Sequence, residues 1–172
     1  MKKIVQMDNK VLRTKAQEVA KEDITSKKIK DIIKNMNQAL QTQNDGVAIA
    51  APQIGEAYRI FTVSPVLFEK PEEENLVFIN PTIVKKSKES TWLDEGCLSC
   101  RWKVGQVKRH DAVHIHAYDE NGEEFLLFAE GLLAHIFQHE TDHLEGILFV
   151  DKARNLRDMT QEEIDEVLSG SE

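Results

Sequence analysis

Two histidines four residues apart on an apolar helix constrain this chain more than any other feature. The segment His139-Glu140-Thr141-Asp142-His143 follows residues 131–137, which are largely aliphatic and aromatic. Residues i and i+4 project from one face of a helix, so both imidazoles can bind one metal ion. An exposed acidic helix can contain this pentapeptide by chance, but the preceding run is too apolar for a solvated helix. We therefore expect a buried helix with a metal site, where Glu140 serves as general base toward activated water.

A catalytic metal site of this type needs a third protein ligand and an open position. The metzincin protease pattern places a third histidine where Phe149 stands, so that pattern fails here. Carboxylates downstream of His143, such as Asp151 and Glu163, leave other zinc peptidase classes open.

Cys97 offers a third ligand from upstream, at an expected strand edge or turn. A lone cysteine is more often a small buried hydrophobic residue. Cys97 and Cys100 also have the C-x-x-C spacing of redox domains and zinc ribbons, but there is no second such pair and no βαβ pattern around them.

The composition limits the class of protein. The chain has 172 residues, 41% of them hydrophobic, which is enough for one domain with its own core. A net charge of -8 argues against nucleic acid or an anionic membrane as the main partner. No apolar run is long enough to span a bilayer, and the first residues turn polar too soon for a secretory signal. With two cysteines, these features predict a cytoplasmic protein in a reducing compartment.

The hydrophobic pattern changes twice along the chain. Residues 26–44 carry apolar side chains at helical spacing, and Thr160 with Glu163 forms the capping box of a last helix. Strands are expected at 58–63, 76–79, 113–118 and 124–129, with a hairpin turn at 119–122, and Gly146 can end the histidine helix. The sequence therefore predicts one α+β domain over residues 1–172. Antiparallel or mixed sheets surround the metal-binding helix, with further helices near both ends.

Three separated stretches resemble the signature motifs of the peptide deformylase family, in the same order. They are Gly46-Val47-Ala48-Ile49-Ala50-Ala51-Pro52-Gln53, Glu95-Gly96-Cys97-Leu98-Ser99 and Gln138-His139-Glu140-Thr141-Asp142-His143-Leu144. The second and third match without change. Weaker likeness occurs at residues 11–13, 80–81, 131–134 and 146–151, so the resemblance runs through most of the chain.

The resemblance implies one divalent metal ion held by Cys97, His139 and His143, with water as fourth ligand. Ferrous iron is the family's usual metal, and zinc, nickel or cobalt can replace it. The implied reaction removes the N-formyl group from the initiator methionine of nascent polypeptides, with formate as product. The implied partners are therefore N-formyl-methionyl nascent peptides, with the ribosome as the expected place of encounter, and we expect a monomer.

The resemblance also implies roles for three further residues. Glu140 takes a proton from water and passes it to the leaving amine. The side-chain amide of Gln53 and the backbone N–H of Leu98 donate hydrogen bonds to the developing oxyanion. By the same analogy the substrate contacts eight residues, which are Gly46, Val47, Ala48, Glu95, Gly96, Leu132, His135 and Ile136.

Four positions depart from the family pattern. Ala48 replaces a glycine of the first motif, Cys100 and Arg101 replace a hydrophobic residue and a proline, and His135 stands where an arginine or aliphatic residue is common. An added methyl at Ala48 can narrow the substrate cleft, and Arg101 adds positive charge at its rim and removes a fixed φ. These changes bear on substrate preference and rate, because every expected ligand and Glu140 are retained.

Two other hypotheses remain open on the sequence alone. One is a zinc peptidase or other amidase that uses His139, Glu140 and His143 with a third ligand other than Cys97. The other is a diverged deformylase-like protein that binds peptide ends with weak activity, a hypothesis that Ala48 and Arg101 motivate.

Overall fold

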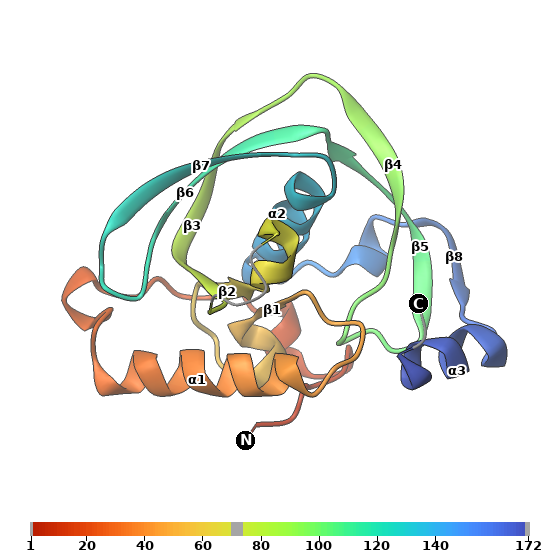
Figure 1. The fold of residues 1–172 in the computed structure, drawn as a ribbon, viewed down its shortest axis with the longest axis horizontal. Coiled ribbons are helices and arrows are strands. Elements are labelled where there is room, and N and C mark those ends of the chain that lie inside the picture. Colours follow the sequence, from red (N-terminus) through yellow and green to blue (C-terminus); the bar gives the residue numbers. More distant parts are fainter. Residues whose placement is uncertain (1, 70–73, 171–172) are drawn as a thin grey trace.

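The computed structural model describes residues 2–69 and 74–170, and in it two antiparallel sheets enclose the helix α2 (Gly131–Leu144). Figure 1 shows α2 at the centre, with strands arching over it. The five-stranded sheet has the order β1 (Ala48–Ala50), β2 (Ile60–Val63), β3 (Leu76–Lys86), β6 (Ala112–Tyr118) and β7 (Glu124–Glu130). The three-stranded sheet has the order β4 (Ser90–Glu95), β5 (Lys103–His110) and β8 (Arg154–Asp158). This arrangement confirms the predicted α+β class.

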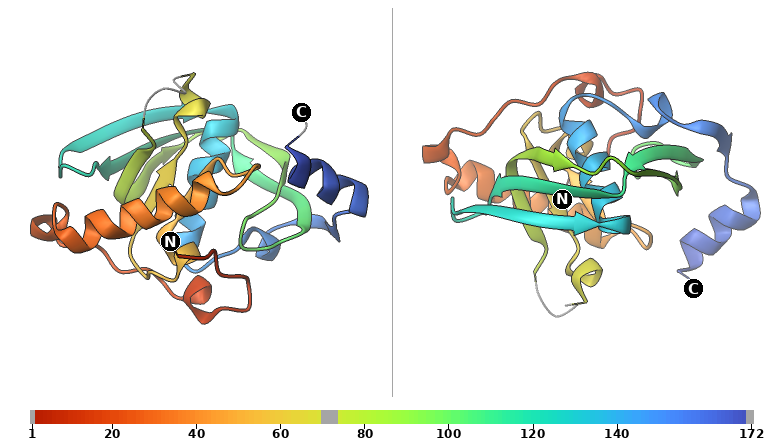
Figure 2. Two further views of the ribbon diagram at one scale, coloured as in Figure 1. Left: turned by 60° about the horizontal axis from the view of Figure 1, so that its bottom comes forward. Right: turned by 90° about the horizontal axis from the view of Figure 1, so that it is seen from above.

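Helix α1 (Lys27–Gln41) forms where the apolar spacing predicted it. The Ser26 hydroxyl accepts a hydrogen bond from the Ile29 N–H at 3.3 Å, which satisfies one free donor of the first turn. One face of α1 is buried in a cluster that includes Ile49, Ile60 and Ile79 of the five-stranded sheet. Figure 2 shows α1 lying across that sheet.

Helix α2 is held at both ends by glycines with positive φ, Gly131 at 59° and Gly146 at 75°. A Cβ on Gly146 would lie 2.8 Å from the backbone of Arg13, so this position also requires glycine for space. Ala134, Phe137 and Leu144 of α2 are buried in a second cluster with side chains of β2, β3 and β6. These contacts fix the height and rotation of the helix that carries the two histidines.

The prediction is weakest for the three-stranded sheet, because the sequence predicted none of its strands, β4, β5 and β8. All residues of β8 are exposed, and the buried positions of β5 are Gly105, Val107 and Arg109, of which only Val107 is a large apolar residue. Neither segment therefore shows the apolar alternation that indicates a half-buried strand. Helix α3 (Gln161–Ser169) has the predicted capping box, with the Glu163 N–H donating to Thr160 Oγ1 at 3.3 Å.

Short 3-10 turns connect several of these elements. They are η1 (Lys10–Arg13), η2 (Lys21–Asp23), η3 (Ala51–Ile54), η4 (Pro65–Phe68) and η5 (Phe149–Asp151). Within residues 2–69 and 74–170, none of the helices combines the length and apolarity needed to cross a bilayer.

Candidate metal centre and active site

Cys97, His139 and His143 converge at one point although 42 residues separate the cysteine from the first histidine. Their ligand atoms all lie within 4.8 Å of one another. The Cys97 Sγ and His143 Nε2 atoms are 3.3 Å apart, and the two imidazole centroids are 5.0 Å apart. Metal–ligand bonds of about 2.0–2.3 Å put ligand atoms on one ion roughly 3.5 Å apart. The three side chains therefore fit a tetrahedral divalent ion with small adjustments.

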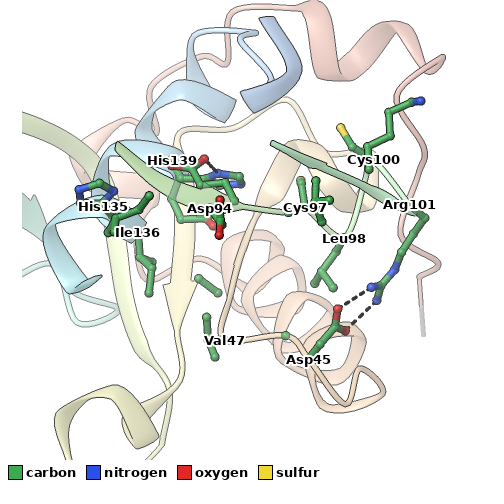
Figure 3. A pocket seen from close by; sticks show the side chains of 18 of the residues that line it. Asp45, Val47, Asp94, Cys97, Leu98, Cys100, Arg101, His135, Ile136 and His139 are labelled. Atoms are coloured by element: carbon green, nitrogen blue, oxygen red, sulfur yellow. Dashed lines mark hydrogen bonds and ion pairs between the residues drawn. The ribbon is translucent and has the colours of Figure 1, made fainter. Parts of the chain in front are cut away.

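The three ligands come from two separate segments of the chain. Helix α2 supplies the histidines on one face, and Cys97 lies just after the end of β4 (Figure 3). A thiolate with two imidazoles suits zinc or iron, so the donor set agrees with the expected metals.

A chain of ion pairs orients His139. Its Nδ1 lies 2.9 Å from Glu95 Oε2, and Glu95 in turn accepts two hydrogen bonds from Arg109. Arg109 Nη1 donates to Asp142 Oδ2 at 2.8 Å, and Lys152 Nζ donates to the same carboxylate. A histidine that donates its Nδ1 proton to a carboxylate presents Nε2 as the metal ligand.

Glu95 is ionised in this network. Burial alone would raise its pKa, but the hydrogen bonds from His139 and Arg109 outweigh burial and lower the pKa to about 2. The same carboxylate raises the pKa of His139 against the effect of burial. The Nδ1 of His143 has no hydrogen-bond partner in the part of the chain that the structure describes, and burial, with the nearby charges of His139 and Arg109, lowers the pKa of His143 well below the ordinary value. His143 is therefore a neutral imidazole, which is the form that binds metals.

Glu140 has the opposite surroundings to Glu95. It is buried, and its Oε2 has no hydrogen-bond partner in the described part of the chain. Burial, reinforced by the negative charge of Glu95, raises its pKa to about 7, although His139 and Arg109 act the other way. A bound divalent ion and its water would supply the missing partners. The unpaired oxygen is therefore a second sign, besides the donor set, that the site is built for a metal.

The Cys97 thiol is held near that of Cys100. The hydrogen bond with Cys100 and burial raise the pKa of Cys97, whereas the pKa of Cys100 is lowered. A metal ion deprotonates a coordinating thiol outright, so ion binding reverses this preference at Cys97. Cys100 itself is buried with Leu12 and Phe149 and is not one of the three clustered ligands.

Gln53 is fixed by its own turn. Its Oε1 accepts a hydrogen bond from the Ala50 N–H at 2.8 Å, so its amide nitrogen faces the cysteine. Gln53 Nε2 lies 3.6 Å from Cys97 Sγ and 3.3 Å from Ser99 Oγ. The donor is thus aimed at the metal centre by backbone structure, although the side chain is buried.

A pocket of about 330 Å³ opens onto this centre (Figure 3). It is lined by all the residues expected to contact substrate: Gly46, Val47, Ala48, Glu95, Gly96, Leu132, His135 and Ile136. Gln53, Cys97, Leu98, His139 and Glu140 also line it. The residues that the sequence singled out therefore line one cavity, but their roles in binding remain predictions.

The departures from the family pattern differ in their surroundings. Ala48 is nearly buried and pairs with Val63 of β2, so its methyl packs partly into the sheet. His135 is also nearly buried, and burial lowers its pKa. Arg101 does not simply add positive charge, as the sequence suggested, because it forms a bidentate ion pair with Asp45.

Two further residues of the network and the pocket, Arg109 and Met159, carried no sequence signal. Arg109 lies in the polar strand β5. Trp102, just before β5, and Met159, just after β8, both line the pocket. The downstream carboxylates are engaged elsewhere, since Asp151 pairs with Arg13 and Glu163 with Arg157. Among the described residues, the group that could hold a metal ion consists of Cys97, His139 and His143 and includes none of these downstream carboxylates.

Comparisons with known proteins agree with this geometry. The family model described as polypeptide deformylase matches residues 1–159. Peptide deformylase 1 of Clostridium perfringens is 43% identical over 144 residues, which are 84% of this chain and 92% of that protein. A peptide deformylase of Desulforudis audaxviator is 37% identical over 89% of this chain and 94% of its own length.

Solved structures show the same likeness. A peptide deformylase from Legionella pneumophila superposes with a TM-score of 0.81 at 33% identity, covering 90% of this chain and 87% of that one. The enzyme from Synechococcus elongatus, solved with actinonin, has a TM-score of 0.78 at 34% identity and covers 96% of this chain and 83% of its own. With a family match over most of its length and a Cys–His–His centre in the cavity, this chain belongs to the polypeptide deformylase family.

Proposed function

We propose that this enzyme hydrolyses the N-formyl group of N-formyl-methionyl peptides with one divalent ion held by Cys97, His139 and His143. One observation carries the proposal. The three ligand atoms lie within 4.8 Å of one another, next to the buried Glu140, whose Oε2 has no hydrogen-bond partner among the described residues, and Cys97, His139 and Glu140 line a pocket. The net reaction consumes one water and yields formate and a free amino terminus.

Ferrous iron is the metal we propose, with zinc, nickel or cobalt as substitutes. When bound, the ion supplies Lewis acidity that makes water nucleophilic near neutral pH and polarises the formyl carbonyl. The thiolate and imidazole donors permit each of these metals.

Glu140 is the residue that moves the proton. A carboxylate whose pKa lies near 7 can accept a proton from water and return it to the leaving amine at neutral pH. Its burial also keeps bulk water from competing for that proton.

Gln53 and the Leu98 N–H are the proposed donors to the oxyanion. Gln53 is suited to this because its amide is already turned toward the metal centre by the bond from Ala50. A donor held in place before the reaction needs no reorganisation when the charge develops.

The substrate backbone is proposed to lie along β1. Among the described residues this strand is at the edge of the five-stranded sheet and pairs with β2, and Ala48, with Gly46 and Val47 just before it, lines the pocket. An extended peptide can add to such an edge through main-chain hydrogen bonds. Val47, Leu132, His135 and Ile136 would then form the walls around the methionine side chain.

The proposed setting is the cytoplasm, where nascent chains leave the ribosome, with the enzyme acting as a monomer. The substrate is then a flexible peptide end, which fits an open groove better than an enclosed cavity.

The test is formate release by protein purified without oxygen and loaded with ferrous iron. Formyl-Met-Ala-Ser is the substrate, and acetyl-Met-Ala-Ser and the unblocked peptide are the controls. We expect rapid formate release from the formylated peptide, inhibited by actinonin. Stoichiometric metal, measured by elemental analysis, without any formate release would overturn the assigned reaction.

A further inference from the structure

Arg101 spans two walls of the pocket (Figure 3). Its Nη1 lies 2.6 Å from Asp45 Oδ2 and its Nη2 lies 3.0 Å from Asp45 Oδ1. Nη2 also donates to Gln43 Oε1 at 2.7 Å, and the guanidinium stacks 4.7 Å from the Trp102 ring centroid. Four contacts on one side chain make this a defined geometry rather than a mobile surface pair.

The two walls belong to different sheets. Asp45 lies in the loop that leads through Gly46 and Val47 into β1 of the five-stranded sheet, whereas Arg101 lies in the turn between β4 and β5 of the three-stranded sheet. The backbone N–H of Arg101 also donates to Gln6 Oε1, and Gln6 Nε2 donates to the Leu98 carbonyl. Arg101 therefore links the loop before β1, which contains Gln43 and Asp45, to the segment that carries Cys97 and Leu98.

The walls meet closely beside this ion pair. A Cβ on Gly46 would lie 2.8 Å from Leu40 Cδ1 and 3.3 Å from Leu98 Cδ1. Gly46 and Leu98 both line the pocket, so the two walls approach each other closely at this point. A small change in the separation of the walls would therefore change the space between the β1 edge and Leu98.

The pair also controls which charge a substrate meets. The Arg101 side chain is 20% exposed and that of Asp45 is 34% exposed, so both can be reached from the groove. Paired, they present no net charge there. Of the other charged lining residues, Glu95 is paired with Arg109 and Lys103 with Asp158, Glu140 is buried beside the metal ligands, and Asp94 is exposed on the β4 wall.

We propose that Arg101 and Asp45 form a latch that positions the β1 edge against Leu98 and neutralises the groove for the peptide residues that follow methionine. Arg101 and Asp45 are positioning and specificity-determining residues in this proposal, and neither touches the reacting atoms. The proposal rests on the proposed function. Loss of one partner leaves the other charge free to attract a peptide side chain of opposite sign.

The experiment measures kcat and KM on three amidated peptides, formyl-Met-Ala-Ser, formyl-Met-Ala-Asp and formyl-Met-Ala-Lys. The proteins are the iron-loaded wild type, Asp45→Asn, Arg101→Gln and the double variant. Arg157→Gln is the matched control, because Arg157 forms a bidentate pair with Glu163 away from the pocket. Thermal unfolding and metal content of each variant check that the fold and the metal site are retained.

We expect opposite changes in preference relative to the wild type. Asp45→Asn should shift the ratio of kcat/KM toward the aspartate peptide about five- to tenfold, and Arg101→Gln should shift it equally toward the lysine peptide. The shift should be in KM, and the double variant should return to the wild-type ranking with a higher KM for all three peptides. Arg157→Gln should match the wild type.

A merely structural role predicts a different result. An equal loss on all three peptides, or an unchanged ranking in both single variants, would overturn the latch. Absence of formate from the wild type with every peptide would overturn the proposed function itself and the latch with it.

Discussion

Glu95 contacts His139 and Glu140 follows it in α2, yet the surroundings of the two carboxylates shift their pKa values in opposite directions. Glu95 receives hydrogen bonds from His139 and Arg109, which lower its pKa to about 2. Glu140 is fully enclosed, its Oε2 has no partner among residues 2–69 and 74–170, and its pKa is raised to about 7. Two identical side chains a few ångströms from one metal site thus differ by about five pKa units.

The difference separates positioning from proton transfer. A carboxylate that stays ionised at every working pH can orient a histidine but cannot exchange protons, whereas one that titrates near pH 7 can do so. The network that continues from Arg109 to Asp142 and Lys152 holds the first carboxylate in place. The unpaired second carboxylate is available to water and substrate.

The largest expected effect follows from removing the reactive carboxylate. Glu140→Gln keeps the size of the side chain but cannot accept a proton. In metal-loaded protein, kcat for formate release should fall by about 10²–10⁴. A steady-state assay with formyl-Met-Ala-Ser checks this, and retention of more than a tenth of the wild-type kcat would remove Glu140 from the mechanism.

The same substitution should stabilise the metal-free protein at alkaline pH. The raised pKa means that folding opposes ionisation of Glu140, so wild-type stability declines between pH 4.5 and about 7 and stays lower above that. The gap between 4.5 and about 7 corresponds to about 3 kcal/mol. Urea unfolding of both metal-free proteins should show Glu140→Gln gaining on the wild type between pH 5 and pH 8. A constant difference across that range would contradict the raised pKa.

Glu95→Gln should have the opposite effect on stability and should destabilise the metal-free protein at neutral pH. The lowered pKa means that Glu95 stabilises the fold above pH 4.5, and that this contribution is lost as the pH falls toward 2. It amounts to about 3 kcal/mol at pH 7. Urea unfolding of the metal-free variant at pH 7 and pH 3 checks both the size and the loss.

Glu163→Gln is the matched control for this measurement. Glu163 also has a pKa lowered to about 2 by a bidentate arginine, but it lies at the surface. Solvent screens such a pair, so its removal should change stability far less than removal of Glu95. Equal effects of the two substitutions would show that burial does not distinguish them.

The smallest effect is expected one step further from the metal. Asp142→Asn leaves both hydrogen bonds between Arg109 and Glu95 in place. We expect metal affinity to fall by less than the roughly 10–100-fold typical for loss of a direct partner of a ligand. Competition with a chelator measures this, and a loss as large as that of Glu95→Gln would show that Asp142 is equally necessary.

The sequence predicted those parts of the fold that depend on short-range patterns. Residues 29–40 repeat apolar side chains at helical spacing, and Thr160 with Glu163 forms a local capping box, so both helices were found. Strands β4 and β5 pair with each other across a short turn and β8 adds to β5 from about 50 residues downstream, but none of the three shows an apolar alternation that would have indicated a strand. Their own residues are mostly polar.

The site divides in the same way. The metal ligands, Glu140 and Gln53 could be predicted because they stand in motifs whose spacing reflects the chemistry. Arg109 and the pairing of Arg101 with Asp45 could not be predicted, because each joins residues far apart in the chain through side chains that elsewhere would be solvated. The sequence indicates which groups react, and the structure adds what holds them.

The most direct test of this account measures bound metal and formate release together on Glu140→Gln and Glu95→Gln. Glu140→Gln should bind one equivalent of metal and release almost no formate. Glu95→Gln should bind metal weakly and regain formate release when metal is in excess. If Glu140→Gln instead lost its metal, or Glu95→Gln stayed inactive when saturated with metal, the division between a reacting and a positioning glutamate would be wrong.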